Sequence, residues 1–198
     1  MSDQISIYIQ GFLTLFIVFD PIGNIPLFHS LTVSFDPSKK AKIIKDSIKV
    51  AFLILAGFAL AGNYLLDFFS ISINDFKIAG GILLFVMSIE GLLGQEEGRW
   101  MNREDVAIVP LATPLMAGPG SIYTVMYLMQ PPNGIFVAFF AIVTNVALQW
   151  ALLRSSNRIM KVIGKSGSTI ISRLMAFILS AIAIGMIRSG LTGAYPIG

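Results

Sequence analysis

The feature that most constrains this chain is a long stretch, from Val106 to Leu153, in which no residue carries a formal charge. A membrane-spanning helix needs about 20 mostly apolar residues. The stretch is therefore long enough for two helices, and the turn-forming residues 131–134 divide it. Only 13% of the whole chain is charged and 55% is hydrophobic, whereas a soluble domain carries about 25% charged residues. This composition excludes an ordinary water-soluble enzyme and indicates a polytopic membrane protein.

Further charge-poor windows occur along the whole chain. We expect six transmembrane helices, at about 5–33, 47–66, 74–93, 105–130, 134–154 and 168–190. The predicted fold class is therefore an all-α polytopic membrane protein, with one transmembrane domain over residues 1–198. The first and fourth expected spans are longer than a bilayer requires. We expect no cleavable signal peptide, because the first segment lacks a basic n-region and a small-residue cleavage site.

The basic residues are concentrated in three alternate loops between the expected spans: Lys39, Lys40, Lys42 and Lys45; Arg99 and Arg103; Arg154, Arg158, Lys161 and Lys165. The positive-inside rule places these loops in the cytoplasm and both termini outside a cell membrane. The loops lack the interleaved aromatic residues with which proteins stack single-stranded nucleic acid, so no nucleic-acid partner is expected.

The two longest spans share a double-proline motif. Prolines at 21 and 26 recur 93 residues later, at 114 and 119. We expect residues 1–95 and 104–195 to be two copies of a three-span unit, and an odd number of spans puts such copies in opposite orientations. Inverted repeats with broken helices are typical of secondary transporters. The alternative is that membrane helices share composition and often contain proline.

Each proline pair is expected to break its helix inside the bilayer, because proline removes a hydrogen bond and clashes with the preceding turn. The ends of half-helices bind charged groups. An acidic residue inside a membrane span costs free energy, so its presence there indicates a functional role. A small zwitterion fits this pattern, with its carboxylate at a half-helix N-terminus and its amino group near Asp20 or backbone carbonyls. Asp20 is also the candidate for ion coupling in addition to capping the second half-helix, and the alternative is that it serves as a helix cap alone. The candidate substrate-binding residues are Asp20, Pro21, Gly23, Asn24, Pro26, Thr113, Pro114, Gly118, Pro119, Gly120 and Ser121.

Few other polar residues lie within the expected spans. Glu90 lies near the cytoplasmic end of its span, while Asn145 and Gln149 are one helical turn apart and could join helices or line a path. Four glycines are expected to permit close helix packing: Gly57, Gly62, Gly80 and Gly81. With no cysteine and one histidine, neither a metal centre, a cofactor nor a Ser-His-Asp triad is expected.

The motifs at residues 19–26 and 109–121 resemble those of the MarC family of integral membrane proteins. The resemblance extends through residues 78–85 and 173–176 and covers all six expected spans. It implies the inverted-repeat fold of lysine-exporter-like transporters, and transport of small neutral amino acids such as glycine and alanine. Ala176 is a departure, since Gly80 in the first repeat leads us to expect glycine there.

We therefore expect a secondary transporter of glycine-like or alanine-like amino acids that works by alternating access and is not an enzyme. The alternatives are efflux of drugs or other small metabolites, a channel, and an intramembrane enzyme acting on lipid. Proton coupling, sodium coupling, transport direction and homo-oligomerisation stay open.

Overall fold

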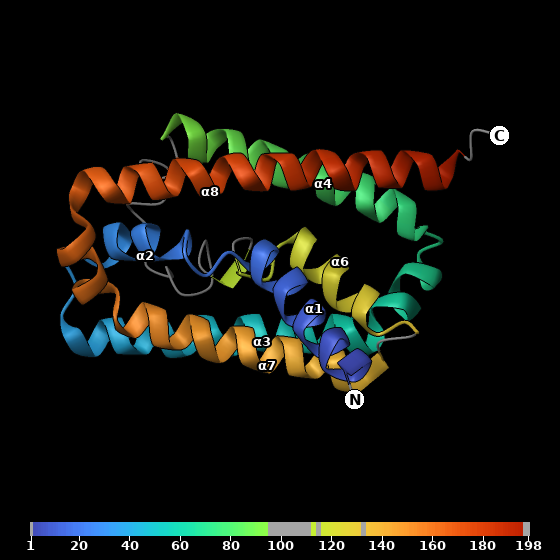
Figure 1. The fold of residues 1–198 in the computed structure, drawn as a ribbon, viewed down its shortest axis with the longest axis horizontal. Helices are drawn as coiled ribbons and strands as arrows, with labels where there is room; N and C mark the ends of the chain where they lie inside the picture. Colours follow the sequence, from blue (N-terminus) through green and yellow to red (C-terminus); the bar gives the residue numbers. More distant parts are fainter. Residues whose placement is uncertain (1, 95–111, 114–115, 132–133, 196–198) are drawn as a thin grey trace.

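The computed structural model describes residues 2–94, 112–113, 116–131 and 134–195, and in these ranges it contains helices and no strand (Figure 1). The helices are α1 (Ser2–Phe19), α2 (Asn24–Thr32), α3 (Pro37–Phe68), α4 (Ile73–Leu93), α6 (Pro119–Leu128), α7 (Gly134–Arg154) and α8 (Ser156–Ala194).

Local capping explains where α3 and α4 begin and end. Asp36 accepts hydrogen bonds from Ser38 N (2.9 Å) and Lys39 N (3.0 Å), which closes the first turn of α3. A hydrogen bond from the Ser38 hydroxyl is the main reason that the pKa of the Asp36 carboxyl lies below its ordinary value. Ser72 and Asp75 form a reciprocal capping box at the start of α4, which ends at Gly94 in the left-handed conformation (φ 71°).

Three helices in the described ranges are long and apolar enough to cross a membrane: α4, α7 and α8. A fourth span results if α1 and α2, which meet at a 42° bend, are taken as one broken helix. The expected spans at 74–93 and 134–154 thus coincide with α4 and α7. The expected span at 47–66 lies inside α3, which begins with a lysine-rich segment at Pro37. Helix α3 is not among the helices that are both long and apolar enough to cross a membrane. The expected span at 105–130 lies largely outside the described residues, which contain only the short α6 of that region.

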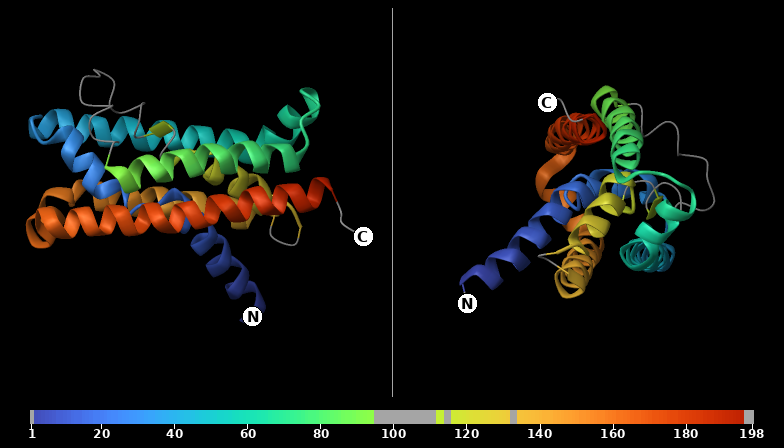
Figure 2. Two further views of the ribbon diagram at one scale, coloured as in Figure 1. Left: turned by 90° about the horizontal axis from the view of Figure 1, so that it is seen from above. Right: turned by 90° about the vertical axis from the view of Figure 1, so that its right-hand side faces the viewer.

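Large apolar side chains are exposed over much of the surface, as expected for helices that face lipid. On α1 they recur every four residues at Ile5, Ile9, Leu13 and Ile17, which forms one continuous apolar face. Figure 2 shows the first part of α1 projecting away from the rest of the bundle. Apolar faces this extensive are rare on soluble monomers.

The helices pack in two long pairs, α4 against α8 and α3 against α7 (Figures 1 and 2). The shorter helices lie between the pairs: α6 contacts α4 and α3, and α2 contacts α8 and α7. The lysine-rich start of α3 and the basic segment that joins α7 to α8 lie at the same end of the bundle, with the ends of α2 and α4. The third basic loop, with Arg99 and Arg103, lies outside the described residues.

The last expected span began at residue 168, but helical structure begins earlier. Ser156 starts a short arm of α8, and Gly164 interrupts it with φ 70° and ψ 176°, a conformation that strains any residue with a side chain. The chain therefore turns sharply at the basic end and resumes as one long helix.

Glycines allow α4 to approach its neighbours closely. A Cβ atom on Gly81 would lie 2.9 Å from Ala183 O of α8, and one on Gly80 would lie 2.9 Å from Pro119 Cβ of α6. On α3, a Cβ atom on Gly62 would lie 2.7 Å from the sulfur of Met126 on α6. These three expectations are confirmed, whereas the expectation for Gly57 is wrong, because no atom of the described residues lies within 4 Å of a Cβ placed there.

A Gly81→Leu variant is expected to be less stable by about 1–3 kcal/mol, the usual cost of overpacking. For a chain of this size each kcal/mol lowers the melting temperature by about 2–4 °C, which thermal unfolding in detergent measures. Gly57→Leu is the matched control and should not lower the melting temperature, because the added side chain meets open space. Equal losses in both variants would contradict close α4–α8 packing as the cause.

Candidate substrate-binding cavity

The break between α1 and α2 is built around Asp20. Its backbone is left-handed (φ 48°), its N–H donates to Phe16 O (3.1 Å), and its carbonyl accepts from Asn24 N (3.1 Å). Its Oδ1 accepts a hydrogen bond from Gly23 N (3.0 Å), and Asn24 Nδ2 donates to Phe19 O (3.0 Å). The two polar side chains thereby satisfy backbone groups that the break frees inside an apolar bundle. Asp20 thus caps the turn at residues 21–23 that leads into the second half-helix, whereas Gly23, the N-cap of α2 itself, makes no side-chain capping bond.

The turn at Gly23 has no room for a side chain. A Cβ atom there would overlap the Asp20 carboxylate. Any larger residue must therefore push Asp20 out of its capping position.

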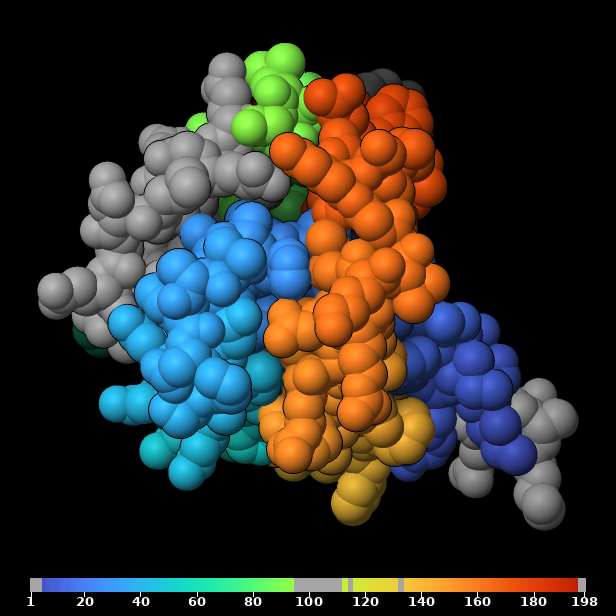
Figure 3. All heavy atoms as spheres, turned by 90° about the vertical axis from the view of Figure 1, so that its left-hand side faces the viewer, coloured from blue at the N-terminus to red at the C-terminus, as the bar shows by residue number. Residues whose placement is uncertain are grey.

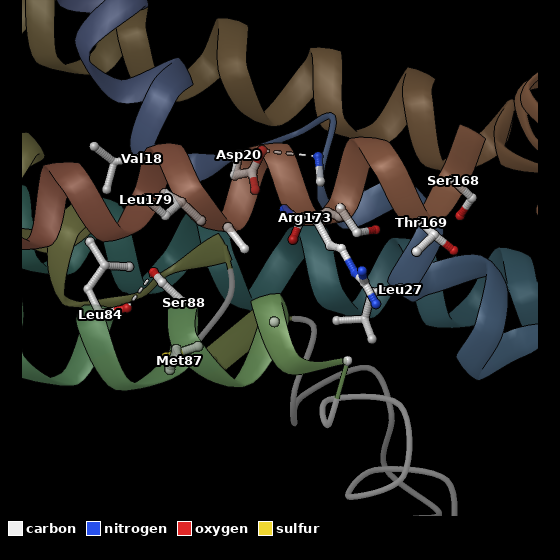
Figure 4. Close-up of a pocket in the computed structure, with 16 residues that line it drawn as sticks. Val18, Asp20, Leu27, Leu84, Met87, Ser88, Ser168, Thr169, Arg173 and Leu179 are labelled. Carbon is white, nitrogen blue, oxygen red and sulfur yellow. Dashed lines mark hydrogen bonds between the residues drawn. The ribbon is translucent and has the colours of Figure 1, made fainter. Parts of the chain in front are cut away.

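A cavity of about 220 Å³ lies between the break, α4 and α8 (Figure 4). Asp20, Gly23 and Asn24 form one wall, Ser88 lies on α4, and Arg173 lies on α8. The volume is below the roughly 300–1,000 Å³ of pockets for drug-sized ligands. The cavity therefore suits a small solute.

Among the described residues, one acidic and one basic side chain line the cavity. Asp20 is only 8% exposed, so its carboxylate is withdrawn from solvent. Arg173 lines the same cavity from a different helix, and the two side chains do not form an ion pair. Three hydroxyl side chains of α8 complete the polar lining: Ser168, Thr169 and Ser172. An acid and a base held apart in a small cavity can each bind one end of a zwitterion.

The cavity runs toward the basic end of the bundle. Its lining extends from Val18 and Leu179 in the interior to Gly94, where α4 ends, and Ser168, shortly after the Gly164 turn. On the interior side, Phe19 and Leu15 are fully buried.

The second motif lies behind the cavity wall. Ala117 N donates to Ala112 O (2.9 Å), a π-helical i to i−5 bond, directly before α6 begins after Gly118. A Cβ atom on Gly120 would overlap Val18 and would lie 3.5 Å from Leu84 Cδ2, and both of these residues line the cavity. The two motifs are therefore brought together, with the second one supporting the wall.

The structure thus divides the predicted site residues into groups. Asp20, Gly23 and Asn24 line the cavity, while Pro21 and Pro26 belong to the break and to α2 without lining it. Thr113 precedes α6, and Pro114 lies outside the described residues. The remaining four lie at the start of α6: Gly118, Pro119, Gly120 and Ser121. The Ser121 hydroxyl is 1% exposed and has no hydrogen-bond partner in the part of the chain that the structure describes.

Sequence reasoning missed the α8 wall of the cavity. Arg173 lies inside the expected last span, and a basic residue at such a position is by default a functional candidate. That signal could have identified it, whereas the three α8 hydroxyls resemble ordinary polar residues near a helix end. In the described ranges no three His, Asp or Glu side chains come together as a metal site would require.

A separate polar pair lies in the core of α7. Asn145 and Gln149 are both fully buried. Asn145 Nδ2 donates to Phe12 O of α1 (3.2 Å) and to Ala141 O (2.9 Å), which confirms a role in joining helices. The Gln149 amide has no partner among the residues that the structure describes.

A Gln149→Leu variant is expected to be more stable by about 1–3 kcal/mol, because an unpaired buried amide pays its full desolvation cost. The melting temperature in detergent measures this change, and Asn145→Leu is the control, expected to destabilise because it removes a bond between helices. A lower melting temperature for Gln149→Leu would instead show that the amide binds a group such as an internal water.

Comparison with known proteins places the chain in a widespread family. The family model for MarC, the "MarC family integral membrane protein", matches residues 5–195. A UPF0056 membrane protein of Methanocaldococcus jannaschii is 37% identical, with 94% of this chain and 97% of the relative covered. The UPF0056 membrane proteins YvbG of Bacillus subtilis and YhcE of Escherichia coli are 32% and 34% identical. Those two alignments cover 97% and 96% of this chain, and 97% and 94% of the relatives. No solved structure matches the chain significantly. The chain is thus similar over nearly its whole length to membrane proteins of archaea and bacteria, and it belongs to the MarC family of integral membrane proteins.

Proposed function

We propose that this protein is a secondary transporter of small zwitterionic amino acids of the glycine and alanine kind. The observation that carries the proposal is the cavity of about 220 Å³ with Asp20 on one wall and Arg173 on another. The substrate ammonium binds the Asp20 carboxylate, and the substrate carboxylate binds the Arg173 guanidinium. Both ends of the molecule are then recognised, and little volume is left for a long side chain.

The sequence predicted the carboxylate at a half-helix N-terminus, and the proposal now gives that role to Arg173. The hydroxyls of Ser168, Thr169 and Ser172 offer further donors beside it. The start of α6, with the buried Ser121 hydroxyl, stays as a second anion-binding element that a different conformation could present to the cavity.

Alternating access by two inverted repeats is part of the proposal. In the two proposed repeats, α4 corresponds to α8 and α6 corresponds to α2. Exchanging the two repeats therefore turns the α4–α6 contact into the α8–α2 contact, and both contacts are present. The same exchange leaves the α4–α8 and α3–α7 pairs unchanged. This pattern supports six spans with opposite orientations, the break at 113–121 being the counterpart of the break at 20–26. By the positive-inside rule the basic end faces the cytoplasm, so the cavity as it stands leads inward and both termini face outside the cell membrane.

Uptake into proteoliposomes tests the function. Radiolabelled glycine and alanine are offered under proton, sodium and counter-substrate gradients, and saturable uptake under at least one gradient is expected. Propionate and ethylamine, which each lack one charged end, should compete poorly. Absence of saturable uptake under all gradients would overturn the proposal.

The same vesicles separate the alternatives. Efflux of drugs requires a larger cavity and would be indicated by transport of bulky apolar compounds in preference to glycine. A channel would conduct without saturation. Turnover of lipid, with no solute uptake, would indicate an intramembrane enzyme, which the proposal excludes. Comparison of the gradients identifies the coupling ion, with Asp20 as the proposed coupling residue.

A further inference from the structure

A second cavity, of about 270 Å³, lies at the basic end of the bundle and is distinct from the substrate cavity. It lies where the start of α3 meets the end of α7 and the start of α8. Figure 3 shows this face, with the segment around the start of α3 and the segment joining α7 to α8 facing each other across it. No residue in the described ranges lines both cavities.

Two cationic side chains from different helices line this second cavity. Lys40 projects from the first turns of α3, and Arg154 is the last residue of α7. No acidic residue lines it among those described, and neither cation forms an ion pair with a described residue. Two positive charges around one hollow favour an anion.

The start of α8 adds a second, independent feature. Its N-cap, Ser155, makes no side-chain capping bond, and the next two residues, Ser156 and Asn157, line the cavity. Arg158 N donates to Ser155 O (2.9 Å), which leaves the N–H groups of Ser156 and Asn157 to bind an acceptor, and the helix dipole favours negative charge there. The start of α3 differs, because the Asp36 carboxylate already occupies it. An anion in the cavity is thus directed toward Lys40, Arg154 and the first turn of α8.

The remaining lining shows what kind of anion fits. Trp150 lies one turn before Arg154, whose guanidinium carbon is 5.3 Å from the centre of the indole ring. Tryptophan and basic residues at the end of a membrane helix are typical of the boundary between lipid headgroups and acyl chains. Apolar side chains, including Ile44 and Leu153, complete the wall. The basic side chains of the cavity can therefore bind a phosphate, and the apolar part of its wall can contact the adjoining lipid backbone and the first acyl carbons.

We propose that this cavity binds the phosphate headgroup of an anionic phospholipid from the leaflet at the basic end. The phosphate lies between Lys40 and Arg154 and accepts hydrogen bonds from the first turn of α8. Basic pockets between transmembrane helices bind anionic lipid headgroups in this way. The bound lipid links α3, α7 and the arm of α8 that precedes Gly164. The proposal depends on this cavity alone and stands whether or not the protein transports amino acids.

Native mass spectrometry of the protein in a neutral detergent tests the proposal with phosphatidylglycerol and phosphatidylcholine. We expect one phosphatidylglycerol to bind in preference to phosphatidylcholine. The Lys40→Gln/Arg154→Gln variant should lose about 25-fold in affinity for it, at about fivefold for each basic residue. Lys42→Gln/Arg158→Gln is the matched control: it removes the same charge from the same end, but from exposed residues that do not line the cavity. The control should lose less than about twofold.

Each contrary result has a definite meaning. Equal losses in the two double variants would overturn the proposal, because they would show general attraction to a basic surface. Tight binding of glycerol 3-phosphate or inorganic phosphate, with displacement of the lipid, would also overturn it in favour of a soluble phosphate ligand. If the double variant does not fold, the single Arg154→Gln variant is compared with Arg158→Gln by the same measurement.

Discussion

An Asp20→Asn variant is expected to lose about 10- to 150-fold in the kcat/KM of glycine uptake while keeping its fold. The size of the effect follows from the loss of a charge-assisted hydrogen bond to the substrate ammonium, which contributes about 1.5–3 kcal/mol. The fold is expected to survive because the asparagine side-chain oxygen can still accept the hydrogen bond from Gly23 N. Uptake in proteoliposomes gives the rate, and the melting temperature in detergent confirms that the variant is folded.

The comparison with Asp20→Ala separates the two roles of this residue. Alanine removes the charge and the cap, so both uptake and melting temperature should fall. Unchanged uptake by Asp20→Asn, with an unchanged response to a proton gradient, would leave Asp20 as a helix cap alone.

An Arg173→Gln variant is expected to lose about 30- to 100-fold in apparent affinity for glycine, because the substrate carboxylate loses its charged partner. Arg173→Lys should recover part of the loss, since lysine keeps the charge but not the planar fork of donors. Discrimination against ethylamine, which has no carboxylate, should weaken in Arg173→Gln. Competition assays with glycine and ethylamine measure all three effects.

Arg188 supplies the matched control for that experiment. It lies on the same helix, α8, and does not line the cavity. Arg188→Gln should leave the affinity for glycine unchanged. A loss as large as that of Arg173→Gln would mean that positive charge on α8 matters in general, and that Arg173 has no specific contact with the substrate.

Much of the helical structure could be predicted because local chemistry determines it. The limits of α4 follow from Ser72, Asp75 and Gly94, and α7 follows from a mostly apolar run without charge after residues 131–134. The break in the first span was predictable from proline and glycine, and the capping role of Asp20 from its position before Pro21.

What the sequence did not reveal depends on contacts between distant segments. Arg173 reaches the cavity only because α8 packs along α4 and beside α2. The early start of α8 escaped prediction because its polar arm resembles a loop, and the turn at Gly164 is a single residue. The second motif was predicted to line the site, whereas Gly120 supports Val18 and Leu84 from behind. The six-span count depends partly on residues outside the described ranges, and the lysine-rich start of α3 makes that helix longer than its apolar core.

The hydrogen bond from Gly23 N to Asp20 has a consequence for the proposed transport cycle. The same carboxylate holds the joint between α1 and α2 and faces the substrate cavity. In the proposed function, a substrate ammonium shares the Asp20 carboxylate with Gly23 N and weakens that hydrogen bond, so substrate binding and the stiffness of the joint are coupled. Under the proposed function, a substrate whose ammonium binds Asp20 would loosen the joint, whereas a molecule without an ammonium, such as propionate, would leave the joint locked.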